Sequence, residues 1–169
     1  RVGEVEGKSY FFKTKEEFEA MVDRGEFLEH AMIYDNYYGT PKKAIFDELD
    51  MGRDVILEIE MQGAMQIKEV YPQAVFIFVL PPSLQELRNR IVGRGTETEE
   101  QIEKRFNSAY DEIKLLGDYD YFIFNNIVEK SAEEILNILE VEKNKVSRYK
   151  KDILDMFEKE IKNVKTIIK

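Results

Sequence analysis

Short apolar runs that alternate with helical patterns constrain the fold of this chain more than any other feature. Residues 55–59 and 74–80 form two such runs, and residues 62–70 between them have the periodicity of a helix. Neither run alternates polar with apolar residues, which is typical of strands buried on both faces. A third apolar run covers residues 121–124. Because helical crossovers connect parallel strands, we predict an α/β fold with a parallel sheet flanked by helices.

Capping patterns predict where several helices begin and end. Some Ser and Thr residues stand three positions before a Glu or Gln, the spacing of a capping box; they are Thr14, Ser83, Thr98 and Ser131. Thr40 before Pro41 predicts another helix, with Thr40 as its N-cap. Gly25 and Gly52 predict helix ends. The helix that starts at Ser131 meets no glycine or proline, so we expect it to continue to Lys169.

Two strands are expected in the first part of the chain, at residues 8–12 and 26–34. Alternation along the second strand places four side chains on one face: Phe27, Glu29, Ala31 and Ile33. Glu29 is thereby a carboxylate among apolar neighbours. Burial of a carboxylate is costly unless another group pairs with it, so Glu29 requires a partner.

The charge of the chain limits its partners. The formal net charge is −9 at pH 7, which disfavours general binding to nucleic acid or to an anionic membrane. A basic site must then be a local pocket for a small anion. The absence of cysteine excludes a disulfide framework and a thiolate metal site, and the lone His30 cannot form a zinc site. No apolar run approaches the roughly 20 residues of a membrane-spanning helix, and we expect a cytoplasmic protein.

Arginine is concentrated in one stretch of this acidic chain. Four of the eight arginines lie in residues 88–105, a stretch that also contains Gly93 and Gly95. A guanidinium presents a planar fork of donors that fits phosphate oxygens, so the cluster favours a phosphate clamp. The alternative is a solvated helix surface on which neighbouring glutamates pair with the arginines.

Seven segments, taken in order, resemble the guanylate kinase family. They are residues 1–12, 25–29, 36–40, 57–63, 81–83, 93–100 and 121–125. The resemblance implies a P-loop nucleoside monophosphate kinase fold with a core, a small mixed GMP-binding lobe and a helical lid. It also implies transfer of the γ-phosphoryl group of ATP to GMP or dGMP, with Mg²⁺ bound through the ATP phosphates.

The same resemblance divides the chain into functional regions. Residues 1–41 would form the GMP-binding lobe and residues 88–108 the lid. Residues 42–87 and 109–141 would form the core, and residues 142–169 a C-terminal helical extension.

The P-loop of such a fold is not found in this sequence. Gly7-Lys8-Ser9 resembles the end of that motif, but Val2 stands where its first glycine is required, and a strand instead of a helix is expected to follow. Residues 1–7 read as the middle of a segment. We therefore expect the first strand and the P-loop to lie upstream of Arg1.

The resemblance assigns a set of residues to GMP: Arg1, Tyr10, Glu29, Tyr38, Gly39, Thr40 and Glu60. Glu29 would accept hydrogen bonds from N1–H and the exocyclic amino group of guanine, whereas adenine presents an acceptor at N1. Thr40 would assist at the base. Arg1, Tyr10 and Tyr38 would clamp the phosphate. Glu60 matches a position near the nucleotide and its magnesium.

A second set matches the lid and the ATP side. Arg90, Arg94 and Arg105 would stabilise the transferring phosphoryl group by charge. Arg90 and Arg94 would also contact ATP, and Asn125 matches a position near the adenine. No side chain is expected to bind the metal directly.

Two alternatives stay open at this point. The first is a guanylate-kinase-like scaffold domain that has lost catalysis and binds a phosphopeptide; the retained lid arginines Arg90, Arg94 and Arg105 favour the enzyme. The second concerns residues 143–169, an amphipathic and lysine-rich helix. We expect it to pack on the core or on a second copy of the chain, giving a homo-oligomer, in preference to a membrane surface.

Overall fold

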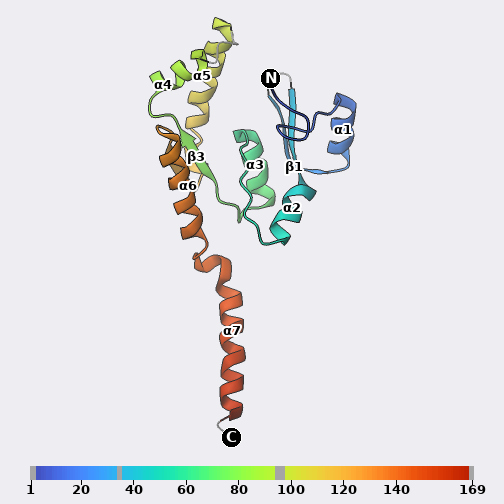
Figure 1. The fold of residues 1–169 in the computed structure, drawn as a ribbon, viewed down its shortest axis with the longest axis vertical. Coiled ribbons are helices and arrows are strands. Elements are labelled where there is room, and N and C mark those ends of the chain that lie inside the picture. The colour runs from blue at the N-terminus through green and yellow to red at the C-terminus, as the bar shows by residue number, and fades with distance from the viewer. Residues whose placement is uncertain (1–2, 34–35, 94–97, 168–169) are drawn as a thin grey trace. The chain divides into compact units, whose positions relative to one another are not determined.

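The computed structural model describes residues 3–33, 36–93 and 98–167, with the backbone alone for residues 164–167. The chain forms two compact units, Arg1–Phe76 and Ile77–Lys169. In Figure 1 the first unit runs from blue to green and the second from green to red.

An antiparallel pair of strands is the centre of the first unit. Strand β1 (Phe27–Ile33) pairs with β2 (Asn36–Pro41), and helix α1 (Lys15–Asp23) precedes them. Helices α2 (Lys42–Asp50) and α3 (Met61–Val70) follow. Helix α3 lies beside β1 (Figure 1) and packs against it, and this contact positions the site described below.

The start of α1 confirms its predicted capping box. Thr14 Oγ1 accepts a hydrogen bond from the Glu17 N–H at 3.2 Å, and the Glu17 carboxylate accepts one from the Thr14 N–H at 2.9 Å. Gly25, with φ of +65°, follows the helix end as predicted. Phe18 stacks on Phe27 with ring centroids 4.6 Å apart, which attaches α1 to the strand pair.

A bulge near the start of β1 separates two side chains that alternation would place together. Phe27 pairs with Pro41 and Glu29 pairs with Thr40, so the register shifts between them. The Phe27 ring lies over Gly39, where a Cβ would be 2.8 Å from it. Because Gly39 and Thr40 are neighbours in a strand, they face opposite sides. The prediction that Phe27 and Glu29 share a face is therefore wrong, since the extra residue of a bulge reverses the alternation.

The strand expected at residues 8–12 is not formed. The chain turns at residues 7–9, and the Gly7 N–H donates to the Tyr10 carbonyl at 2.8 Å. An isolated bridge between Glu6 and Tyr10 is the pairing that results. A local turn thus uses the backbone groups that a strand would have offered to a neighbour. The prediction that Gly7-Lys8-Ser9 is not a phosphate-binding loop is consistent with this turn, since no helix follows it directly.

The strand expected at residues 55–59 is not formed either. None of the described residues pairs with this segment. Its exposure alternates, because Ile56 and Glu58 are exposed while Val55, Leu57 and Ile59 are half-buried. The prediction of a strand buried on both faces is wrong here, because a strand needs a neighbour to bind its N–H and C=O groups.

Helix α2 begins one residue later than expected. Pro41 is its N-cap and makes no side-chain cap bond. Thr40 lies in β2 instead, where its hydroxyl donates to Glu29, so the assignment of Thr40 as N-cap is wrong. Gly52, with φ of +74°, follows the end of α2 as predicted.

The second unit contains a parallel pair of strands, which confirms the predicted strand direction. Strand β3 (Ile77–Leu80) pairs residue by residue with β4 (Tyr121–Phe124). Helices α4 (Leu84–Gly93) and α5 (Glu99–Ile113) and a short 3-10 turn, η1 (Leu116–Asp118), connect the two strands.

Capping at both connecting helices follows the sequence prediction. The Glu86 N–H donates to Ser83 Oγ at 3.1 Å, and the Gln101 N–H donates to Thr98 Oγ1 at 3.4 Å. Burial differs from the prediction in β4, where Ile123 is buried while Phe122 and Phe124 are exposed. One face of this strand is therefore open in the described structure.

The last helical region is divided in two. Helix α6 (Val128–Glu142) begins before Ser131, whose hydroxyl donates to the Ile127 carbonyl at 3.0 Å within the helix. Helix α7 (Val146–Ile167) starts after a break at residues 143–145. The predictions of a cap at Ser131 and of one continuous helix are wrong.

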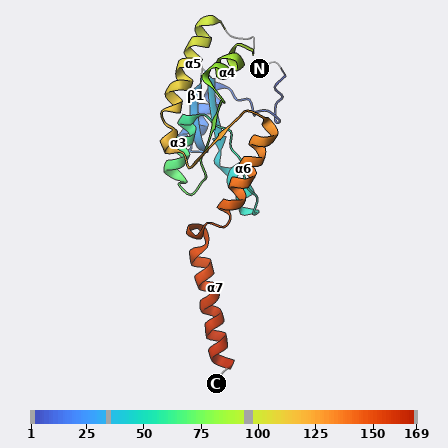
Figure 2. The same cartoon turned by 90° about the vertical axis from the view of Figure 1, so that its left-hand side faces the viewer.

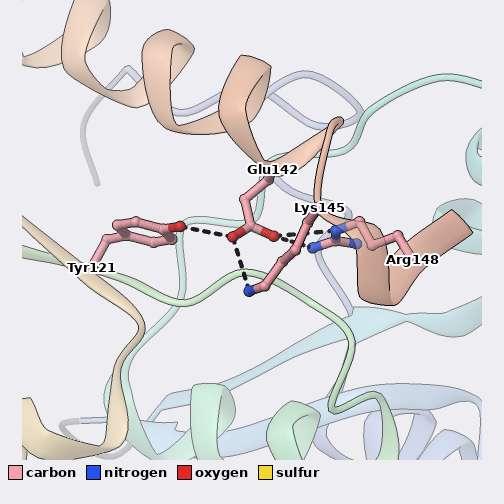
Figure 3. A network of polar contacts seen from close by, with 4 residues as sticks. All are labelled: Tyr121, Glu142, Lys145 and Arg148. Carbon is pink, nitrogen blue, oxygen red and sulfur yellow. Dashed lines mark hydrogen bonds and ion pairs between the residues drawn. The ribbon is translucent and has the colours of Figure 1, made fainter. Parts of the chain in front are cut away.

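A polar cluster of four side chains stabilises this break (Figure 3). Glu142 accepts hydrogen bonds from the phenol of Tyr121 at 2.7 Å, from Lys145 Nζ at 3.1 Å and from Arg148 Nη2 at 2.8 Å. The two basic residues come from the turn and from the first part of α7. They reach a single carboxylate at the end of α6 because the helix is interrupted.

Helix α7 projects away from α6 in both views (Figures 1 and 2). Its apolar side chains are exposed: Ile153, Leu154, Met156, Phe157 and Ile161. Packing of this stripe against a second copy of the chain stays a prediction. Among the described residues, no helix combines the length and the apolar character needed to cross a membrane.

Candidate functional site

A buried carboxylate is the centre of the site in the first unit. Glu29 is only 5% exposed, and its Oε1 accepts a hydrogen bond of 2.6 Å from the Thr40 hydroxyl. The antiparallel register places Thr40 directly opposite Glu29. Two residues that the family resemblance assigned to base recognition are thus brought together, and the partner that Glu29 required is a hydroxyl donor.

Helix α3 closes the other side of this carboxylate. Gly63 lies in the first turn of α3, and a Cβ built there would be 2.4 Å from Glu29 Oε2. The helix backbone therefore contacts the carboxylate at a distance that only glycine permits. A carboxylate near a helix N-terminus is also favoured by the peptide dipoles.

A side-chain amide holds α3 to the edge of β1. Gln66 Nε2 donates to the His30 carbonyl at 2.8 Å, and Gln66 Oε1 accepts from the His30 N–H at 3.1 Å. One amide group thereby satisfies both backbone groups of a strand residue next to Glu29. Sequence reasoning missed Gly63 and Gln66 as site residues. A glycine within a helical pattern was a usable signal, because alanine would be more favourable there.

Two tyrosines lie side by side, Tyr38 on β2 and Tyr10 in the segment before α1. The rings of Tyr10 and Tyr38 meet edge to face, with centroids 5.7 Å apart, and both are partly exposed. Tyr38 is two residues from Thr40 in β2, so the two side chains share a face. The structure thus brings together Tyr10, Tyr38, Thr40 and Glu29, which the sequence assigned to one ligand.

Packing explains why position 39 is a glycine. The Phe27 ring fills the space that a side chain at this position would need, so glycine is required there by packing. Glu60 is the N-cap residue of α3, is exposed and makes no side-chain cap bond. Its carboxylate is accordingly not used to hold the helix end.

The ATP-side candidates lie in the second unit. Asn125 follows β4, and its N–H donates to the Leu80 carbonyl at 2.8 Å, so it lies at the carboxyl ends of both parallel strands. Ligands of open α/β sheets bind at this edge. Helix α4 begins just after the same end of β3 and carries Arg90, whose Nε lies 2.8 Å from Glu86 Oε1.

The remaining arginines are placed differently. Arg105 lies in α5 and is half-buried. Arg1 and Arg94 lie outside the described residues. Within the part of the chain that the structure describes, no group of three or more His, Asp or Glu side chains could hold a metal ion.

The carboxyl group of Glu142, which lies away from these candidates, has a strongly lowered pKa. The hydrogen bond from Tyr121, together with those from Arg148 and Lys145, lowers the pKa of Glu142 to about 2. The same contact raises the pKa of Tyr121. This cluster joins helices and strand, so its charges have a structural use.

Comparison with known proteins matches this chain to one family. The family model described as guanylate kinase matches residues 1–142. A guanylate kinase from Clostridioides difficile (strain 630) is 66% identical over 161 residues, which cover 95% of this chain and 78% of that protein. A guanylate kinase from Clostridium tetani (strain Massachusetts / E88) is 53% identical over 154 residues, covering 91% of this chain and 74% of that protein.

A solved structure gives the same result at the level of the fold. The crystal structure of guanylate kinase from Anaplasma phagocytophilum superposes with a TM-score of 0.74 at 39% identity, covering 86% of this chain and 71% of that one. The predicted P-loop nucleoside monophosphate kinase fold is confirmed by this likeness. The chain belongs to the guanylate kinase family.

Proposed function

We propose that the protein transfers the γ-phosphoryl group of ATP to GMP or dGMP, giving ADP and GDP or dGDP. The observation that carries this proposal is the buried Glu29 carboxylate, bound by Thr40 and placed on the same face as Tyr38. An acceptor for the base and donors for a phosphate are the two requirements of a nucleoside monophosphate site.

Recognition of guanine follows from the chemistry of Glu29. A carboxylate only accepts hydrogen bonds, and guanine offers N1–H and an amino group side by side, whereas adenine has an acceptor at N1. The hydroxyl hydrogen of Thr40 already points to Glu29 Oε1. Thr40 can therefore meet the base only as an acceptor, which suits the exocyclic amino group and adds to the discrimination against adenine.

The phosphate of GMP would be held by the phenols of Tyr10 and Tyr38. The two rings are adjacent and partly exposed, so two O–H donors can approach one phosphate group. Arg1 would complete this clamp. Positioning the acceptor phosphate in line with the transferred group removes much of the entropic part of the barrier.

On the ATP side, Arg90, Arg94 and Arg105 would stabilise the charge of the transferring phosphoryl group, and Asn125 would lie near the adenine. Phosphoryl transfer needs positioning and charge stabilisation from the protein and little covalent chemistry. Mg²⁺ carried by the ATP phosphates supplies further neutralisation of their oxygens. Glu60, an exposed carboxylate that is not used as a helix cap, would lie near GMP and the magnesium.

The regional assignment follows from these roles. Residues 1–41 would act as the GMP-binding lobe, residues 88–108 as the lid, residues 42–87 and 109–141 as the core, and residues 142–169 as an extension. We place the reaction in purine nucleotide metabolism in the cytoplasm.

A coupled assay of ADP formation tests the proposal with full-length protein. GMP and dGMP should be phosphorylated, while AMP, CMP and UMP at the same concentrations should give rates near background. Equal rates with AMP and GMP would contradict the assignment of the base site. The alternative of a catalytically inactive phosphopeptide-binding domain requires no turnover with any nucleotide, so the same assay separates the two functions.

A further inference from the structure

Two residues on one side of α3 act on the same short segment of β1. Gly63 and Gln66 are three positions apart, so they lie on neighbouring turns of one helix face. Gly63 contacts the side chain of Glu29, and Gln66 binds the backbone of His30. The side chain that would recognise the base and the backbone that carries it are thus both held by α3.

The Gly63 contact limits where the carboxylate can lie. Glu29 Oε1 is bound by Thr40 on the β2 side, and Oε2 lies against Gly63, where a Cβ would be only 2.4 Å away. The Glu29 atoms that a Cβ would meet are those of the carboxylate and Cγ of a flexible side chain, so a methyl group at position 63 would displace the carboxylate and not the helix. Such a displacement breaks or bends the hydrogen bond to Thr40.

The Gln66 contact compensates for an irregularity in the strand. The register shift between Phe27 and Glu29 lies just before the segment that Gln66 binds. At a bulge the ladder is locally disrupted, so the backbone needs another anchor if a side chain is to keep a fixed direction. The amide of Gln66 supplies that anchor at both the N–H and the C=O of His30.

We propose that Gly63 and Gln66 are positioning residues that set the selectivity of Glu29 for a purine with both N1–H and a 2-amino group. This proposal rests on the proposed function, because it assigns Glu29 to the base. Neither residue needs to touch the nucleotide. Both act by keeping the carboxylate where it accepts two parallel hydrogen bonds.

The first test replaces Gly63→Ala in full-length enzyme. GMP is compared with inosine monophosphate, which lacks the 2-amino group. We expect the ratio of kcat/KM for GMP over inosine monophosphate to fall by about tenfold or more, with the KM of ATP unchanged within about twofold, because the lost selectivity is that of one hydrogen-bonded group. The displaced carboxylate is buried and loses its hydrogen bond from Thr40, so the melting temperature should fall somewhat, and the unchanged KM of ATP shows that the variant is folded. Gly117→Ala is the matched control, since nothing lies within 4 Å of a Cβ there.

The second test removes the amide with Gln66→Ala and Gln66→Leu. Leucine keeps most of the volume of the side chain but makes neither hydrogen bond to His30. Both variants should raise the KM of GMP and lower the same ratio, whereas Glu69→Ala, an exposed change on the same helix, should leave both at their wild-type values. If Gln66→Leu retains the wild-type ratio, the amide does not position Glu29 and this part of the proposal is overturned.

A double-variant cycle decides whether the effect passes through Glu29. In a Glu29→Gln background, Gly63→Ala should change the ratio no further, because the group it displaces has already lost its selectivity. Additive effects would overturn the proposal. The preference of wild-type protein for GMP over AMP separates the two proposals. If Glu29→Gln abolishes this preference and the Gly63 and Gln66 variants keep it, the proposed function stands and the positioning role fails. If wild-type protein has no such preference, the proposed function fails first, and the positioning role fails with it.

Discussion

The phenol of Tyr121 donates a 2.7 Å hydrogen bond to the carboxylate of Glu142, which is only 4% exposed. Tyr121 starts β4 and Glu142 ends α6, so this bond connects the parallel strand pair to the last helices of the second unit. Lys145 and Arg148 bind the same carboxylate (Figure 3). The ionised form of Glu142 is favoured in the folded protein as a result.

The contribution of the Glu142 carboxylate to the free energy of unfolding should be lost in acid. The hydrogen bond from Tyr121, followed by those from Arg148 and Lys145, holds the pKa of Glu142 at about 2, below its usual value of 4.5. A depressed pKa contributes stability that is fully present above about pH 4.5 and is lost as the pH falls towards 2. Glu142→Gln should lower the free energy of unfolding by about 2 kcal/mol at pH 7, and by progressively less as the pH falls through this range.

Urea unfolding of wild type and Glu142→Gln at a series of pH values measures this difference. Glu140→Gln is the control, because Glu140 pairs with Lys143 at an exposed position of the same helix end. That variant should change stability by less than about 0.5 kcal/mol. A difference between wild type and Glu142→Gln that stays constant from pH 7 to pH 2 would contradict the low pKa.

Glu29→Gln should weaken the binding of GMP far more than the binding of ATP. The amide keeps the shape of the side chain but replaces one acceptor oxygen by a donor, which opposes the N–H groups of guanine. We expect the dissociation constant of GMP, measured by calorimetry, to rise about a hundredfold, as a lost charged hydrogen bond with an unpaired group does. An equal loss of affinity for both nucleotides would contradict the assignment of Glu29 to the base.

Tyr38→Phe should raise the KM of GMP with little change in kcat. The substitution removes one phenolic donor and keeps the ring that meets Tyr10. Tyr37→Phe is a matched control on the adjacent residue, whose ring instead stacks on Phe18. We expect about a tenfold rise for Tyr38→Phe in steady-state kinetics and no change for Tyr37→Phe. The assignment fails if both variants behave alike.

Arg90→Ala should act on turnover. A guanidinium that meets charge only in the transition state lowers kcat when it is removed, by about a hundredfold, with the KM of GMP nearly unchanged. Glu86→Gln is the control, because it breaks the ion pair to Arg90 and keeps the guanidinium. A result in which Arg90→Ala weakens ATP binding at unchanged kcat would show that this arginine only binds.

Gly39→Ala should destabilise the first unit. A methyl group at this position would lie 2.8 Å from the Phe27 ring, which itself stacks on Phe18 and has little freedom to move. Overpacking of this kind costs about 1 to 3 kcal/mol, which thermal or urea unfolding can measure. The same change at Gly117, where a Cβ meets nothing, should leave stability near the wild-type value. If Gly39→Ala is as stable as Gly117→Ala, Phe27 does not fill this space.

Several features followed from the sequence because their atoms are close along the chain. The capping boxes at Thr14 and Thr98 join groups three residues apart, so a short pattern is sufficient to predict them. The parallel direction of β3 and β4 followed from helices between apolar runs. Glu29 was identified because a charge in an apolar alternation needs a partner, and the family resemblance supplied its role.

Other features depended on segments that are distant in the sequence. The bulge before Glu29 is set by pairing with β2, and it moved Phe27 to the opposite face. Gly63 and Gln66 meet β1 only after α3 packs on it, more than thirty residues along the chain. Residues 55–59 have the composition of a strand but no described neighbour to pair with.

The division of the last helical region into α6 and α7 likewise depends on a residue that is distant in the sequence. No glycine or proline interrupts residues 131–169, so local preference favours one helix. The break at residues 143–145 is stabilised by Tyr121, a residue of β4 that binds Glu142 from outside the helix. Local hydrogen bonds and capping can be read from neighbouring residues, whereas the register of a strand, the contact of a helix with a carboxylate and the end of α6 depend on partners that only the folded chain brings together.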